Sequence, residues 1–119
     1  MVLVDTSVWI HHLRNGEPRL KNLLEDARVT VHGFIIGELA CGNLKNRREI
    51  LSLLQTLPAV PAVSQEEALH FIERQALAGM GIGYIDAHLL ASARLSGIPL
   101  WTSDLSLKRV AEKLSLSYA

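Results

Sequence analysis

Short apolar runs that alternate with helical patterns constrain the fold of this chain most strongly. Residues 2–4 are continuously apolar, which is typical of a strand buried on both faces of a parallel sheet. Comparable short runs recur at 29–31, 59–63 and 99–101, and helical patterns separate each from the next. Strands that alternate with helices predict an α/β fold, a sandwich with a parallel sheet.

Helices are predicted where apolar residues recur at helical spacing between turn residues: 6–13, 19–27, 34–41, 47–57, 64–78, 85–95 and 105–114. Ser64 and Glu67 have the spacing of a capping box, and Gly97 follows the helix at 85–95. The tail 115–119 has the pattern of an edge strand. No repeat or linker interrupts the sequence, so residues 1–119 are expected to form a single domain.

Charge and cysteine content restrict the class of protein. Twelve Lys and Arg residues balance twelve Asp and Glu residues, which counts against a nucleic-acid partner unless several acids gather in one pocket and leave the remaining surface basic. The single cysteine, Cys41, excludes a disulfide framework and suits a reducing cytoplasm. No apolar run has the length of a membrane span, and the beginning of the chain lacks a signal-peptide pattern. We therefore expect a cytoplasmic protein with no membrane partner.

Four acidic residues occupy unusual positions. Asp5 and Asp104 follow apolar strands, and the carboxyl ends of parallel strands are where ligands bind in such folds. Glu38 and Asp86 interrupt apolar stripes of their predicted helices, so both are expected to be buried. A buried carboxylate must be paired, protonated or bound to a metal, and no basic residue is well placed beside either one.

Four carboxylates in one cleft repel one another, and a divalent cation relieves that repulsion. Ligands that are all oxygen suit Mg²⁺ or Mn²⁺. These ions support phosphoryl-transfer chemistry, because they polarise a phosphodiester and lower the pKa of a bound water.

Each acid also has a simpler interpretation. Asp5, Asp86 and Asp104 all precede or begin helices and can act as caps, and Glu38 can lie on a partly exposed stripe. The presence of all four acids together indicates a metal site more specifically than any single acid does.

The chain resembles the PIN-domain ribonucleases, in particular the VapC-type toxins of toxin–antitoxin pairs. The resemblance lies in VLVDTSVWI, IIGELACG and GIGYIDAHLLASARLSGIPLWTSD, which occur in family order and at family spacing. It spans essentially the whole chain, and it implies a three-layer α/β/α sandwich with a central parallel sheet. It further implies RNA cleavage that depends on Mg²⁺ or Mn²⁺, and inhibition by a cognate antitoxin.

The resemblance also implies roles for individual residues. The family's acids fall on Asp5, Glu38, Asp86 and Asp104, of which the three aspartates would hold the metal and Glu38 a second ion or the attacking water. Hydroxyl groups that support a ligand or water fall on Thr6 or Ser7 and on Thr102 or Ser103. Many relatives have a further acid where this chain has Ser106, which puts a second tightly held metal in doubt.

Other functions remain open at this point. A phospho-receiver would place an acid pair after the first strand and a lysine after a late one, whereas Asp5 stands alone and Asp104 follows Trp-Thr-Ser. A degenerate, non-catalytic binding module would be expected to have lost an acid. A metal-dependent phosphomonoesterase has the same carboxylate requirements. The histidines form no zinc motif, and Cys41 is expected to be a small buried residue.

The interaction surfaces are predicted from basic and apolar segments. Lys45, Arg47 and Arg48 form either a solvated helix start or the best basic patch for an RNA backbone. The apolar stretches 34–39 and 50–57, with Trp9 and Leu13, exceed what one small core requires. We therefore expect a homodimer and an antitoxin segment that lies on apolar surface and inserts a basic residue near Asp5 and Asp104.

Overall fold

The computed structural model describes all 119 residues and contains a parallel sheet of three short strands. The strands are β1 (Val2–Val4), β2 (Val29–Thr30) and β3 (Leu100–Trp101), in the order β2-β1-β3. Val2 pairs with Val29 on one side of β1, and Leu3 pairs with Leu100 on the other. This arrangement confirms the predicted α/β fold with a parallel sheet.

Two isolated bridges extend the sheet at its edges. Val31 pairs with Ala59 beside β2, and Leu100 pairs with Ser117 beside β3, both in parallel. The strand predicted at 59–63 is therefore wrong, because only its first residue bridges to the sheet. Pro61 lacks the N–H group that a continuing ladder needs. The tail 115–119 likewise contributes one bridge rather than a strand.

Helices fill the intervals between the strands, as the periodicity predicts. They are α1 (Thr6–Asn15), α2 (Pro18–Glu25), α3 (Gly33–Ala40), α4 (Arg47–Thr56), α5 (Gln65–Arg74), α6 (Tyr84–Ser96) and α7 (Leu105–Lys113). The capping box of α5 is present, since Ser64 and Glu67 exchange backbone-to-side-chain hydrogen bonds of 2.9 and 3.1 Å. Helix α5 ends earlier than predicted, and Ala76 beyond it has a φ of 54°.

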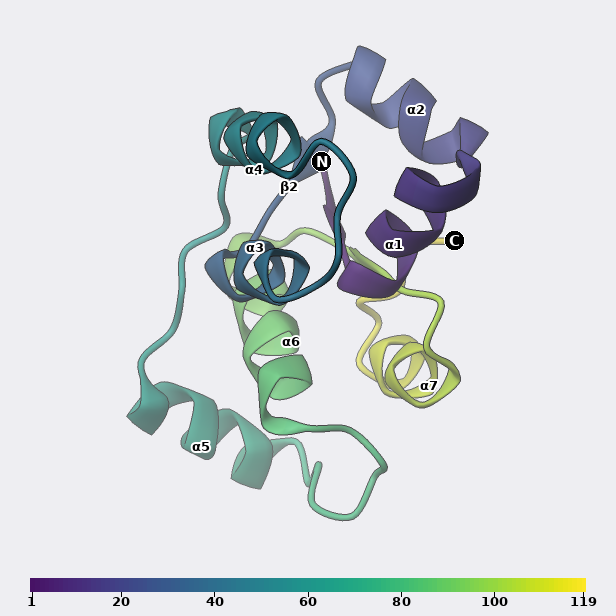
Figure 1. The fold of residues 1–119 in the computed structure, drawn as a ribbon. Helices are drawn as coiled ribbons and strands as arrows, with labels where there is room; N and C mark the ends of the chain where they lie inside the picture. Colours follow the sequence, from purple (N-terminus) through teal and green to yellow (C-terminus); the bar gives the residue numbers. More distant parts are fainter.

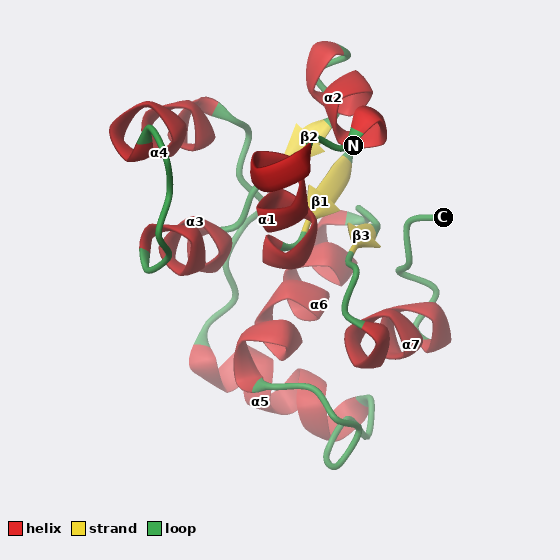
Figure 2. Ribbon diagram, turned by 45° about the vertical axis from the view of Figure 1, so that its right-hand side comes forward, coloured by secondary structure: helices red, strands yellow, loops and turns green.

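Helices cover both faces of the sheet. Figure 1 shows the order of the elements around β1, and Figure 2 shows α1 in front of the strands with α6 behind them. The three residues of β1 are buried, and seven consecutive residues of α6 are buried with them. The carboxyl ends of β1 and β3 are thereby held between α1 and α6. No helix combines the length and the apolar character that a bilayer crossing requires.

Candidate active site

Asp5 lies at the end of β1 and is buried, with only 6% of its surface exposed. Its Oδ2 atom accepts hydrogen bonds from the hydroxyl groups of Thr102 at 2.7 Å and Ser7 at 2.8 Å. Although Asp5 occupies the position before α1, its side chain accepts no bond from the helix backbone. The cap interpretation of Asp5 is therefore wrong, and hydroxyl groups alone hold its carboxylate.

The end of β3 is joined to the same hydroxyl groups. The Asp104 N–H donates to Thr102 Oγ1 at 3.1 Å, and the Ser103 N–H donates to Ser7 Oγ at 3.0 Å. Asp104 is exposed, and its Oδ1 accepts the Leu107 N–H at 3.0 Å. Asp104 is thus a genuine helix cap for α7, and its position beside Thr102 also brings it next to Asp5.

Glu38 reaches the cluster from α3. Thr6 at the start of α1 donates its hydroxyl to Glu38 Oε1 at 2.7 Å. The expectation that Glu38 is buried is wrong, because the face of α3 that carries Glu38, Phe34 and Cys41 is exposed. The helix buries Ile35 and Leu39 instead. Cys41 is correspondingly exposed rather than buried.

Asp86 lies in the first turn of α6 and is half-buried, so the expectation of a buried side chain holds only in part. Burial raises the pKa of Asp86 above its ordinary value, and the negative charges of Asp5, Asp104 and Glu38 raise it further, against the opposing effect of a hydrogen bond from the Gly83 N–H. The four predicted acids therefore share one electrostatic environment. None of them forms an ion pair, since the only ion pair in the structure joins His11 to Glu17 at 3.8 Å.

The chemistry of this acid cluster, defined as Asp5, Glu38, Asp86 and Asp104, fits a divalent cation. The hydrogen bonds described above engage one oxygen of each carboxylate and leave the other available. All the atoms available to bind a metal are oxygen atoms, as Mg²⁺ and Mn²⁺ prefer. As placed, no three of these side chains close into a complete metal-binding group. A cation would draw the free oxygen atoms together and offset their mutual repulsion.

Arg47 and Ser106, which the sequence also singled out, both lie in contact with neighbouring segments of the chain. The Arg47 guanidinium donates to the carbonyl oxygens of Ala40 and of Gly42, the latter at 3.1 Å, so it closes the end of α3. Ser106 is half-buried and packs beside Gly81. A Cβ atom added to Gly81 would lie 3.4 Å from the Ser106 hydroxyl oxygen. The basic patch predicted around Arg47 therefore has one of its cations already engaged.

The burial of two histidines, His32 and His88, was not predicted from the sequence. His32 Nδ1 accepts the Phe34 N–H at 3.0 Å and so caps α3. Burial lowers the pKa of His32, and the imidazole of His88 lowers it further. A histidine two residues before a predicted helix was the available signal for the cap, whereas the electrostatic effect of His88 acts between residues far apart in the sequence.

The fold is that of the PIN domain class. The chain matches the PIN domain over residues 2–113, and it belongs to this family. It is similar to the ribonuclease VapC32 of Mycobacterium tuberculosis, with 43% identity over 120 residues that cover 100% of this chain and 97% of the relative.

Solved structures show the same fold at lower sequence identity. PAE2754 from Pyrobaculum aerophilum superposes with a TM-score of 0.66 and 16% identity, over 95% of this chain and 90% of its own. A toxin–antitoxin complex from Klebsiella pneumoniae contains a chain with a TM-score of 0.64 and 22% identity, over 87% of each chain. These similarities support the PIN-like architecture, which the sequence resemblance implied.

Proposed function

We propose that this chain is a VapC-type PIN ribonuclease, which hydrolyses RNA phosphodiester bonds with Mg²⁺ or Mn²⁺ and acts as the toxin of a toxin–antitoxin pair. One observation carries the proposal: carboxylates from four separate parts of the chain converge with no basic partner to neutralise them. The family membership and the full-length similarity to a ribonuclease support it. We further propose that residues 1–119 act as one nuclease domain in the cytoplasm.

The roles follow from how each side chain is held. Asp5, Asp86 and Asp104 would hold the cation, with Thr102 and Ser7 fixing the Asp5 carboxylate. Glu38 is fixed by Thr6 at the open side of the cluster, where it can bind a second ion or orient the attacking water. The Ser103 N–H keeps the Ser7 hydroxyl in place. When bound, the metal polarises the phosphodiester and neutralises the charge that develops on it.

Removal of the metal is expected to abolish RNA cleavage. Purified protein should cleave single-stranded RNA with Mg²⁺ or Mn²⁺ and lose that activity in EDTA, because the carboxylates alone would repel the phosphate. A gel assay of RNA beside a small phosphomonoester separates this function from a phosphatase. Cleavage that continues undiminished in EDTA would contradict the mechanism. A chain that binds partners but hydrolyses neither substrate would instead be a non-catalytic module.

An apolar groove next to the cluster supports an antitoxin partner. The groove has a volume of about 260 Å³, and α1, α2 and α4 line it with Trp9, Leu13, Leu24, Ile50, Leu53, Leu54 and Leu57. Helix α1 links the two sites, since Thr6 and Ser7 serve the acid cluster while Trp9 and Leu13 face the groove. An amphipathic antitoxin segment would lie in this groove and insert an arginine among the carboxylates. Phe34, expected on the same surface, is not part of it.

Replacement of Leu53 is expected to release the toxin from its antitoxin. Leu53 is 56% exposed in the groove, so Leu53→Glu should weaken antitoxin binding by about tenfold or more without unfolding the protein. Leu69→Glu is the matched control, because Leu69 is 51% exposed on α5 outside the groove. Copurification and growth rescue by the co-expressed antitoxin give the measurement. Equal rescue of both variants would exclude this docking surface.

We also propose that the protein forms a homodimer. Large apolar side chains remain exposed outside the groove, among them Leu95 and Leu105. Sedimentation of the purified chain decides between a monomer and a dimer.

A further inference from the structure

A second cleft begins where the acid cluster ends. It has a volume of about 520 Å³, and the side chains that matter for its chemistry are Arg19, Trp101, Thr102, Lys108, Glu112 and Tyr118. Thr102 belongs to both sites, because it lines this cleft and donates its hydroxyl to Asp5 at 2.7 Å. A chain bound at the acid cluster therefore has an adjacent cavity to enter.

An aromatic pair and a cation form one wall of this cleft. The rings of Trp101 and Tyr118 lie 5.6 Å apart at an interplanar angle of 46°. The Arg19 guanidinium carbon lies 4.8 Å from the centre of the Trp101 ring and 5.3 Å from that of Tyr118. Both rings are only partly buried. The wall thus presents two tilted aromatic rings with a charged guanidinium against them, next to the acid cluster.

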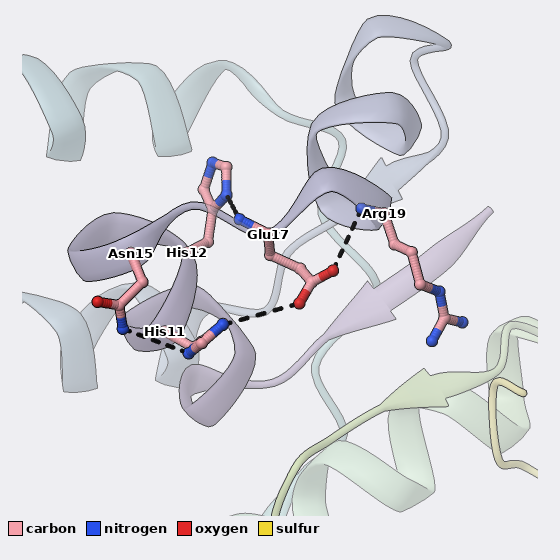
Figure 3. A network of polar contacts seen from close by, with 5 residues as sticks. All are labelled: His11, His12, Asn15, Glu17 and Arg19. Carbon is pink, nitrogen blue, oxygen red and sulfur yellow. Dashed lines mark hydrogen bonds and ion pairs between the residues drawn. The ribbon is translucent and has the colours of Figure 1, made fainter.

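The position of Arg19 is fixed by its backbone. Glu17 caps α2 by accepting the Arg19 N–H at 3.2 Å, and the Glu17 N–H itself donates to His12 Nδ1 at 3.0 Å. Figure 3 shows that the Arg19 side chain extends away from this network of polar contacts. At its far end the guanidinium donates to a main-chain oxygen of Ala119 at 2.6 Å. No carboxylate side chain neutralises it, because His11–Glu17 is the only ion pair.

Lys108 supplies a second cation at the cleft, and this one is unpaired. It lies one turn along α7 from Asp104, is exposed and forms no ion pair. Glu112 is the only acidic side chain that lines the cleft, against the two basic side chains of Arg19 and Lys108.

We propose that this cleft is a subsite for a nucleotide of single-stranded RNA next to the bond that is cut. Proteins that bind single strands combine a cationic path for the backbone with aromatic or guanidinium planes on which bases stack. Here the base stacks on the wall of Arg19, Trp101 and Tyr118, while Lys108 and Arg19 bind the phosphate. The subsite rests on the proposed ribonuclease function and adds how the substrate is held.

Binding and kinetics test the subsite separately from the chemistry. In EDTA, a mixed-sequence single-stranded RNA of about ten nucleotides should quench the fluorescence of Trp101 on stacking. The other tryptophan, Trp9, is only 4% exposed and should not respond, so Trp101→Phe should remove the quenching but keep binding. Trp101→Leu should raise the KM for RNA by about tenfold with little change in kcat.

Charge variants test the subsite through the salt dependence of RNA binding, which would not change if the residues had only a structural role. Arg19→Met and Lys108→Met should each raise KM several-fold and lower the slope of log Kd against log salt by about one. Arg14→Met and Arg109→Met, on the same or neighbouring helices, are the matched controls. If wild-type protein cleaves RNA but Lys108→Met matches Arg109→Met in KM and salt slope, the subsite is overturned. Absence of all RNA cleavage would instead overturn the proposed function. If Arg19→Met unfolds, Lys108→Met still decides, because Lys108 has no structural partner.

Discussion

Asp5→Asn should reduce RNA cleavage by about a thousandfold, because loss of one metal-binding carboxylate removes several kcal/mol of transition-state stabilisation. Asparagine has the same shape, and its carbonyl oxygen can still accept from Thr102 and Ser7. The fold should therefore survive while the chemistry fails. In a bacterial host, wild-type protein should arrest growth, whereas the variant should be harmless at the same expression level.

An exposed aspartate provides the control for this experiment. Asp26 lies at the end of α2 and outside the acid cluster, so Asp26→Asn changes the same charge without touching the site. It should arrest growth as the wild type does, and co-expression of the neighbouring small open reading frame should restore growth. If wild type and Asp5→Asn prove equally harmless and no partner copurifies, the toxin function is wrong even though the PIN fold stands.

Asp86→Asn should abolish cleavage but leave the metal-free protein as stable as wild type or more so. The Asp86 carboxylate is half-buried among three other negative charges, and neutralising it relieves their repulsion. The asparagine carbonyl oxygen can still accept the Gly83 N–H. Thermal unfolding in EDTA measures the effect. A variant that melts far below wild type without metal would show that Asp86 is a structural cap.

The pH dependence of this stability has a definite sign. Because the pKa of Asp86 is raised above the ordinary value of an aspartate, the folded protein binds this proton more readily than the unfolded chain. The stabilisation from the protonated form is complete below the unfolded pKa and is lost as pH rises through the folded pKa. In EDTA, wild type should therefore lose more thermal stability than Asp86→Asn as the pH rises above about 4.

The sequence predicts those features of the site that depend on where strands end. Asp5 and Asp104 each follow an apolar run, and parallel strands deliver both to one edge of the sheet. Asp86 lies at the start of a helix whose residues Leu89, Leu90 and Ala93 are buried, as its apolar stripe predicted, but Asp86 itself is only half-buried. Glu38 was assigned to the acid cluster, but its burial was wrong. An apolar stripe does not say which side of a short helix packs on the core when the opposite side also carries apolar residues.

Contacts between distant segments could not be read from the sequence. The wall of Arg19, Trp101 and Tyr118 joins the start of α2, the end of β3 and the tail, and no spacing rule connects them. The failed strand at 59–63 has a local cause instead. Its apolar residues suggest a strand, but Pro61 interrupts the ladder after a single bridge.

The two hydroxyl groups that donate to Asp5, those of Ser7 and Thr102, restrict which substitutions the protein can accept. Ser7 and Thr102 each accept a backbone N–H from the 103–104 segment and direct their own hydrogen atoms to the same carboxylate oxygen. A substitution that removed the acid without providing another acceptor would leave both hydroxyl donors without a hydrogen-bond partner at a largely buried site. We therefore expect Asp5, Ser7 and Thr102 to change together in evolution, and a lineage that loses cleavage by the smallest step to carry asparagine at position 5 while keeping both hydroxyl groups.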